Sequence, residues 1–525
     1  MEGPACMSAQ MPVPPTGGEF QDRADPLKNR RTLLGMAMMT AIALAAALWA
    51  TRAINPIRGD TYEYLFFDPS RTVGYPAFLW TIQSITGHVS LAVQAQMVLL
   101  AGSLLFLGWS FHSFVRRPAF SYAFQAILVG QVAIWKASAY LMTEAVSTAL
   151  VAIWCAQLLR LIRHFSLRGA ALLVLFSGLA TIVRPSLIAL FLGAALFLAV
   201  VRPARERGRL LLLVGAGAIL AWSATPLAQL LVHGSAATTS PLARGVLQHT
   251  LYCDQPIVAR DPDSAFVEQY SAKVRSYIDT APTDVQEQLR RAYSTPLRFG
   301  LIIPVLGRRH NLERRSQVDP YLSPIAYDRV EANPLCYASS VAGAYYRMAT
   351  FDTNRTKQDE RRIHQFTTIH PPVEVPQYPV LPTDDRLARQ TAAAVHDQVS
   401  GLNPERMHFD FDGKVSDLTV LPVRLFYGAT AIIGLLALVW VAIGRQARPK
   451  HRRPIAGAAA LGLSFHATLA ITAIVELGLS RYVIPLWPMV CTTMAIAALG
   501  LVERRRLTGR IQAAWLEGGL EPALT

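Results

Sequence analysis

Three carboxylates and an arginine lie close together in the stretch DTYEYLFFDPSRTVGYPAFLW, residues 60–80, which directly follows an apolar segment. The acids are Asp60, Glu63 and Asp68, and the arginine is Arg71. A carboxylate at a membrane surface can act as the general base for an acceptor hydroxyl, and the forked donors of arginine suit a phosphate. These residue types therefore predict acid–base chemistry on a phosphate-bearing substrate.

Ionisable residues interrupt the apolar sequence at three further places. Such groups are costly near hydrocarbon unless they are paired or hydrated, so each is a candidate for a functional site. The candidates are Lys136 and Glu144 in KASAYLMTEA, Arg184 in TIVRPS, and Glu476, Arg481 and Tyr482 in VELGLSRYVIP.

Each candidate also has a structural interpretation. Asp60 could cap a helix, because Asp is a favoured N-cap residue. Glu144 could pair with Lys136, and Arg184 could anchor a helix end. Glu63 and Asp68 could be solvated loop charges or partners that hold another site residue. Glu476 could form a salt bridge with Arg481. Tyr75 and Tyr482 could serve as aromatic anchors at the membrane interface.

The composition indicates where these residues lie. The chain has 525 residues, of which 52% are hydrophobic and only 16% are charged, so we expect a membrane protein. The formal net charge of +15 could suggest nucleic-acid binding. However, the basic residues form short clusters between apolar segments rather than one polar face, so we expect no nucleic-acid partner.

The predicted fold is an all-α polytopic membrane protein with about ten transmembrane helices. Apolar segments of about 17 to 25 residues are expected for helices that cross a bilayer, and some of these segments are shorter. The predicted spans are Thr32–Thr51, Val89–Val115, Phe120–Ala139, Val146–Leu161, Leu167–Val183, Leu187–Val201, Leu210–Val232, Leu425–Gly444, Ile455–Leu477 and Tyr482–Val502.

Basic residues predict the orientation of these spans. Clusters of Arg and Lys with 22 members in all occur at 23–31, 116–117, 160–168, 202–209, 445–453 and 504–510, whereas the alternate connections, apart from the long loop, carry seven. The positive-inside rule then places both termini in the cytoplasm and the candidate residues on the exterior face. The first span could instead be a cleaved signal sequence, but its polar lead is long for a signal, so we expect a retained anchor.

The domain organisation follows from this orientation. We expect a cytoplasmic tail at 1–31, a transmembrane module at 32–232 with a catalytic first exterior loop at 52–88, a mainly helical extracytoplasmic loop domain at 233–421, a second transmembrane module at 422–502 and a cytoplasmic tail at 503–525. Cys253 and Cys336 both fall in the loop domain, where an oxidising exterior permits a disulfide. These two cysteines could also remain unpaired thiols.

Metal-binding patterns such as CxxC, HExxH or clustered His do not occur in the sequence. The sequence therefore calls for no cofactor, and nothing in it supports a divalent cation.

The motifs together resemble those of a known family. The first-loop Asp followed by RTVGYPAFLW, then YLMTEAVS, IVRPS and ELGLSRYVIPLWP, are similar to landmarks of the GT-C superfamily of polytopic glycosyltransferases. The resemblance covers about 32–232 and 422–502, and the nearest branch comprises bacterial relatives of protein mannosyltransferases, aminoarabinose transferases and rhizobial lipopolysaccharide galacturonosyltransferases.

This resemblance implies an enzyme of the bacterial inner membrane that contributes to cell-envelope polysaccharide biosynthesis. Its donor would be a polyprenyl-phosphate sugar and its acceptor a glycan or lipid-linked molecule on the exterior face. Asp60 matches the catalytic carboxylate of the first loop, Glu144 a later acidic position, and Arg184 and Arg481 basic positions suited to the donor phosphate. The first loop lacks the family's tandem acidic pair, so the base could be Asp60, Glu63 or Asp68.

The expected catalytic residues are therefore Asp60 and Glu144. The expected substrate-binding residues are Glu63, Asp68, Arg71, Tyr75, Lys136, Arg184, Glu476, Arg481 and Tyr482. Two other functions stay open. The first is a flippase for a lipid-linked glycan, which would also need polar groups deep in its transmembrane helices. The second is a polysaccharide polymerase or ligase, which would transfer a whole glycan.

Overall fold

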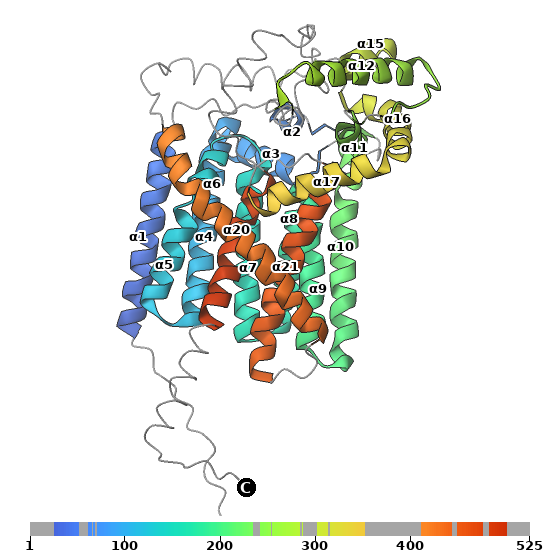
Figure 1. The fold of residues 1–525 in the computed structure, drawn as a ribbon. Helices are drawn as coiled ribbons and strands as arrows, with labels where there is room; N and C mark the ends of the chain where they lie inside the picture. Colours follow the sequence, from blue (N-terminus) through green and yellow to red (C-terminus); the bar gives the residue numbers. More distant parts are fainter. Residues whose placement is uncertain are drawn as a thin grey trace, which may run out of the picture.

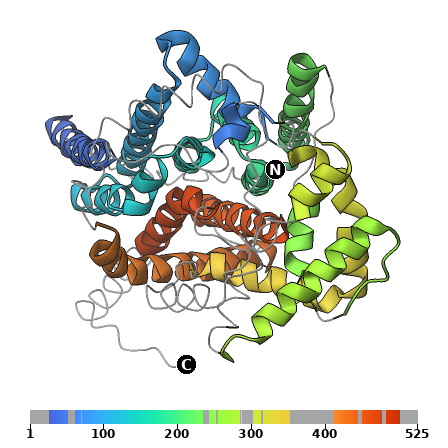
Figure 2. The same cartoon turned by 90° about the horizontal axis from the view of Figure 1, so that it is seen from above.

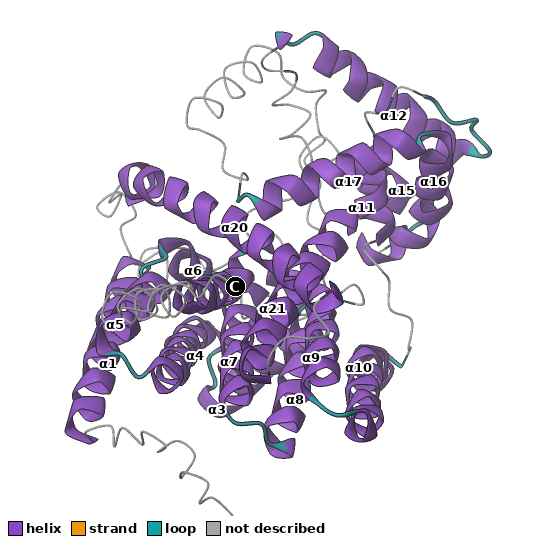
Figure 3. Ribbon diagram, turned by 60° about the horizontal axis from the view of Figure 1, so that its bottom comes forward, coloured by secondary structure: helices purple, strands orange, loops and turns teal. Residues whose placement is uncertain are grey.

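The described part of the computed structural model is entirely helical (Figure 3). It comprises residues 26–51, 61–65, 67–68, 71–234, 242–251, 253, 255–283, 286, 302–312, 315–351, 411–443, 449–475 and 482–500. No strand occurs in these residues. The prediction of an all-α protein agrees with this architecture.

Six helices in the described ranges are long and apolar enough to cross a membrane (Figure 1). They are α1 (Pro26–Ala50), α4 (Ala92–Val115) with the 3-10 turn η1 (Val89–Leu91) before it, α7 (Thr143–Arg163), α10 (Ala204–His233), α20 (Phe411–Ile443) and α21 (Pro449–Val475). Four shorter apolar helices lie among them: α5 (Pro118–Val129), α8 (Leu167–Val183), α9 (Ala189–Val201) after the 3-10 turn η2 (Pro185–Ile188), and Ile484–Gly500, which begins with η6 (Ile484–Leu486).

Helix α7 forms the centre of the bundle and packs against α4, α8 and α21. Trp154 of α7 is fully buried, and its indole N–H donates to the Ser177 hydroxyl of α8 at 2.9 Å. Small residues bring other helices close together, as in membrane helix pairs generally. A Cβ atom on Gly434 of α20 would lie 2.7 Å from Cα of Gly462 on α21. By contrast, α1, α10 and α20 expose many large apolar side chains, which suits helices that face lipid.

The predicted span Phe120–Ala139 is wrong in its second half. Helix α5 ends at Val129, and a separate short helix, α6 (Val132–Ala137), follows. Gln131 between them adopts an extended backbone, and its side-chain oxygen accepts the N–H of Ala133 as the cap of α6. With 12 residues, α5 is about 18 Å long, which is shorter than a hydrocarbon core of about 30 Å.

A second group of helices covers one end of the bundle, and we call it the cap (Figure 2). It consists of α11 (Leu242–Thr250), α12 (Pro262–Asp279), α15 (Ile302–Arg309), η3 (Arg315–Val318), α16 (Asp319–Ala332) and α17 (Pro334–Ala349). The described part of the predicted loop domain is thus helical, as expected.

The cap has an apolar core of its own, in which Leu247, Val267 and Leu322 are fully buried. Two ion pairs lie inside it: Arg244 with Asp319 at 2.7 Å, and Arg329 with Glu268. Removing one partner of such a buried pair is strongly destabilising, because the other charge is left without compensation.

Helix α17 joins the cap to the bundle. It packs on α21, and Met348 near its end is fully buried in the core of the bundle. Phe351, just beyond α17, lies with its ring centroid 4.9 Å from that of Tyr427 on α20. The Tyr427 hydroxyl in turn donates to the Val483 carbonyl at 2.8 Å. The cap and the last membrane turn are therefore linked through α20.

The predicted disulfide between Cys253 and Cys336 is confirmed. It ties the segment after α11 to the first turn of α17, with the two Cα atoms 6.0 Å apart and the cysteines separated by 83 positions in the sequence. Because the bridge closes a long loop, it removes many conformations from the unfolded chain.

Replacing both cysteines by serine should lower the stability of the cap by about 4 kcal/mol, the entropy of closing a loop of this length. The measurement is the rate at which trypsin cleaves the cap in the full-length protein under oxidising conditions. A reducing agent should speed cleavage of the wild type and leave the double variant unaffected. Equal cleavage of both proteins without reductant would contradict the stabilising role of the bridge.

Candidate functional site

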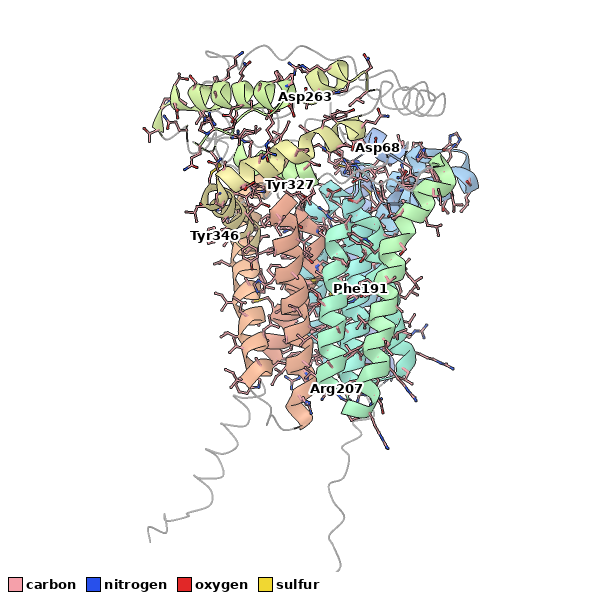
Figure 4. The ribbon with its side chains drawn as sticks, turned by 90° about the vertical axis from the view of Figure 1, so that its right-hand side faces the viewer. Asp68, Phe191, Arg207, Asp263, Tyr327 and Tyr346 are labelled. Atoms are coloured by element: carbon pink, nitrogen blue, oxygen red, sulfur yellow. A yellow bond between two sulfur atoms is a disulfide. The ribbon has the colours of Figure 1, made fainter. Side chains whose placement is uncertain are left out.

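The first loop and the cap lie at the same end of the bundle. The loop contains α2 (Thr61–Leu65) and α3 (Gly74–Thr86), both next to the cap in Figure 1. Figure 4 places Asp68 of the loop at the same end as Asp263 and Tyr327 of the cap, with Arg207 at the opposite end. The candidate site is therefore one end of the helix bundle, bordered by the cap.

Hydrogen bonds fasten the first loop to the turn before α7. The Tyr75 hydroxyl donates to Oε1 of Gln96 on α4 at 2.9 Å. The Gln96 amide nitrogen donates to the carbonyls of Ser138 and Tyr140 at 2.7 and 2.6 Å. The Thr61 hydroxyl donates to the Leu141 carbonyl at 3.2 Å. Thr61 and Tyr75, from two parts of the first loop, thus both connect to the segment that leads into α7, Thr61 directly and Tyr75 through Gln96.

The start of α3 is fastened to the end of α8. The Thr72 hydroxyl donates to the Val183 carbonyl at 3.1 Å, immediately before Arg184. Gly74 lies so close to α8 that an added Cβ atom would approach the Ile182 carbonyl oxygen to 2.7 Å. Only glycine allows this distance between the two backbones.

The outer helix α10 holds the middle of the loop. The Gln229 amide donates to the Asp68 carbonyl at 3.3 Å, and a His233 ring nitrogen lies 3.0 Å from the Phe67 carbonyl oxygen. Phe67 has φ of +48° and is fully buried. A non-glycine residue in this region is strained, and it persists only where the surroundings fix it.

Glu63 and Arg71 form an ion pair within the loop. Nε of Arg71 donates to Oε2 of Glu63 at 2.7 Å, and the guanidinium lies 4.9 Å from the centroid of the Tyr64 ring. The side chain of Glu63 is only 15% exposed. Of the two structural interpretations of Glu63, the ion pair agrees with a partner of another candidate residue rather than with a solvated charge, and part of the binding capacity of Arg71 is already used.

Glu144 is a buried carboxylate at the start of α7. Only 4% of its surface is exposed, and its Oε2 atom accepts no hydrogen bond. The exposed Lys136 does not pair with it, so the salt bridge considered for these two residues does not form. Glu144 lies in the first turn of α7, where the positive end of the helix dipole stabilises a negative charge.

Ser147 extends this polar position by one turn of α7. It is fully buried, and its hydroxyl also has no partner. Residues three apart lie on the same face of a helix, so Ser147 and Glu144 point in similar directions. Ser147 was not predicted as a site residue, although the motif YLMTEAVS contains it at this helical spacing from Glu144.

Arg184 is a buried cation at the break between α8 and η2. It is 7% exposed, and its Nη1 atom has no hydrogen-bond partner. Its guanidinium lies over the ring of Tyr482, 4.9 Å from the centroid. This contact brings two predicted candidates from distant segments together. Pro185, at the first position of η2, ends α8 here, as expected from the IVRPS motif.

Tyr75 does not have the accessibility expected of a substrate-binding residue. It is fully buried and bonds to Gln96, and its ring packs edge-on against Tyr64 at 5.2 Å between centroids. Burial raises the pKa of Tyr75 well above its usual value, and the negative charge of Glu144 adds to the rise. Tyr75 therefore packs the loop and lies within electrostatic reach of Glu144.

Three predicted residues, Asp60, Glu476 and Arg481, lie outside the described residues. Among the described residues, no group of three or more His, Cys, Asp or Glu side chains could hold a metal ion.

Comparisons with protein-family models, with characterised proteins and with solved structures find no match. The geometry at this end of the bundle therefore carries the functional argument.

Gly74→Ala should destabilise the protein by about 1 to 3 kcal/mol, a typical cost of overpacking. The new methyl group would push α3 away from the Ile182 carbonyl beside Arg184. The matched control is Gly102→Ala, because Gly102 lies within α4 with nothing near an added Cβ atom. That change should stabilise the helix by about 0.5 to 1 kcal/mol. Thermal unfolding in detergent compares the two, and similar effects would contradict the close approach at Gly74.

Proposed function

We propose that this protein is a membrane glycosyltransferase that moves a sugar from a polyprenyl-phosphate donor to a glycan or lipid-linked acceptor. The donor's isoprenoid tail would lie in the bilayer, and its phosphate and sugar would reach the end of the bundle that carries the cap. The acceptor would approach from the water on that side.

One observation carries this proposal: two buried, oppositely charged side chains at the same end of the bundle each keep an atom without a partner. They are Glu144 with its Oε2 atom and Arg184 with its Nη1 atom. A buried charge without a partner costs several kcal/mol, so its retention suggests a role beyond folding. The first loop contacts the surroundings of both, through Tyr75 and Thr72.

These two side chains suit the two substrates of a glycosyl transfer, Arg184 the donor and Glu144 the acceptor. Arg184 would bind the donor phosphate through its unused N–H groups, and Tyr482 would hold the guanidinium in place. In the reaction, the acceptor oxygen attacks the anomeric carbon, and the bond from that carbon to the phosphate oxygen breaks. Polyprenyl phosphate leaves with the bonding electrons, and Arg184 stabilises the charge that develops on it. The anomeric configuration is inverted.

A carboxylate must take the proton from the acceptor hydroxyl. We assign this role to Asp60, which directly precedes Thr61, and Thr61 bonds to the turn that leads into α7. Glu144 would orient the acceptor through its free oxygen. Glu63 is a weaker candidate for the base, because Arg71 already holds its carboxylate.

The orientation in the membrane completes the proposal. Six apolar helices are long enough to cross a membrane, and the four shorter apolar helices would complete the ten predicted spans. With both termini in the cytoplasm of a bacterium, the cap and the charged end would face the exterior of the inner membrane.

The test measures transfer of labelled sugar from a panel of polyprenyl-phosphate sugars in proteoliposomes. Asp60→Asn should lower kcat by about 10²-fold to 10⁴-fold, the usual contribution of a general base.

Arg184→Gln should lower kcat/KM for the donor by at least about tenfold, because a charge-assisted hydrogen bond to phosphate is lost. Glu144→Gln should raise the acceptor KM.

Two matched controls make the same chemical changes at exposed positions. Glu331→Gln removes an exposed carboxylate from the cap, and Arg209→Gln removes an exposed guanidinium at the start of α10. Both should leave transfer unchanged. Full activity of a folded Asp60→Asn variant would overturn the assignment of the base. If the wild type transfers no sugar but carries labelled lipid-linked glycan across the bilayer, the protein is a flippase and the proposed function is wrong.

A further inference from the structure

A pocket with several arginines lies at the end of the bundle opposite the cap. It has a volume of about 450 Å³, within the range of small-molecule sites. The last turns of α4 and α7 and the first turn of α8 form its walls. The first turn of α7 and the last turn of α8 belong to the candidate site, so these two helices span the distance between the two sites.

The charged residues of this pocket are all basic. Arg160, Arg163 and Arg168 line it, and no Asp or Glu is among the described residues of its lining. None of the three makes an ion pair with an acid in the described ranges. The N-terminus of α8 adds its positive dipole end, since Ser166 caps that helix by accepting the Gly169 N–H. The pocket is therefore electropositive on several sides.

Two buried polar side chains lie in the wall of the pocket. Ser110 is 4% exposed, and its hydroxyl makes no hydrogen bond. Gln157 also lines the pocket and is 6% exposed, but its amide atoms are not among the buried polar atoms that lack a partner, so they stay open to the pocket. An unsatisfied buried polar group costs about 1 to 3 kcal/mol. Hydrogen-bonding capacity is thus available beside the three arginines.

Topology alone explains part of this arrangement. Arginines gather at the cytoplasmic ends of membrane helices, and the C-terminal dipole of α7 favours Arg160 and Arg163 in its last turn. Neither effect explains why Ser110 stays buried and unpaired in the same wall, or why the arginines surround a cavity. Those features are typical of a binding site for an anion.

The apolar part of the wall indicates what carries the anion. Trp109 and Leu172 line the pocket and are 45% and 39% exposed, and both lie in apolar helices. An aromatic ring at the end of a membrane helix is characteristic of the interface between lipid and water. A molecule bound here would meet apolar surface on one side and arginines on the other.

We propose that this pocket binds the phosphate headgroup of an anionic glycerophospholipid of the adjacent leaflet. Arg160 and Arg168 would contact the phosphate oxygens, and Gln157 and Ser110 would bond to the polar part of the headgroup. The acyl chains would leave past Trp109 and Leu172. This site is separate from the one proposed for sugar transfer, so the two proposals succeed or fail independently.

Native mass spectrometry of the full-length protein in detergent tests the proposal, with phosphatidylglycerol and phosphatidylcholine of the same acyl chains as probes. The wild type should bind phosphatidylglycerol at least about tenfold more tightly. Arg160→Gln with Arg168→Gln should remove at least about tenfold of that affinity, because charge-assisted hydrogen bonds are lost. The matched control, Arg205→Gln with Arg209→Gln, removes the same charge from exposed positions at the same end and should change affinity by less than about twofold.

A second variant tests the cavity without altering any charge. Leu172→Trp would fill the pocket from its exposed wall and should also abolish the preference for phosphatidylglycerol. Equal binding of phosphatidylglycerol by wild type, pocket variants and control would overturn the proposal. If inorganic phosphate binds to the wild type but not to the arginine variant, and phosphatidylglycerol is not preferred over phosphatidylcholine, the lipid assignment is wrong and the site takes a soluble phosphate compound.

Discussion

Gln96 lies in α4 with none of its surface exposed, and its amide bonds to three groups from two other segments. It accepts the Tyr75 hydroxyl and donates to two carbonyls of the turn that leads into α7. Without Gln96, the buried Ser138 carbonyl would lose the Gln96 side-chain amide as donor, at the cost of an unsatisfied buried group, whereas the Tyr140 carbonyl would still accept the Met142 N–H. The amide therefore fixes α3 and the first turn of α7 relative to each other, and with them the position of Glu144.

A rigid frame of this kind allows a membrane protein to keep charges unpaired. Glu144 and Arg184 each lie where a helix begins or ends, and the neighbouring backbone there is held by hydrogen bonds from the first loop. Side chains in such a frame cannot easily rearrange to reach each other. Their unsatisfied atoms therefore keep unused hydrogen-bonding capacity. The strained Phe67 and the close contact at Gly74 show how tightly the loop is packed.

Much of this arrangement was predictable from the sequence, because the spans depend on local composition. The limits of α8 and of η1 with α4 coincide with the predicted spans. The disulfide joins the two cysteines that the sequence assigns to the same loop domain, although the sequence alone also allowed unpaired thiols. The break after α5 was missed, since apolar residues continue across it and only the cap of Gln131 marks it. The burial of Tyr75 was also missed, because it depends on a hydrogen bond to a residue 21 positions away.

The two ends of the bundle differ in how their charged side chains are paired. At the cap end, acids and bases occur together, and many pair within the loop or within the cap, as Glu63 does with Arg71 and Asp319 with Arg244. At the opposite end, the arginines around the pocket have no described acid to pair with. Excess positive charge there follows from topology, but topology does not require a cavity. The wall of that cavity also holds Ser110, whose buried hydroxyl has no hydrogen-bond partner, and this is the observation on which the proposed binding of an anion rests.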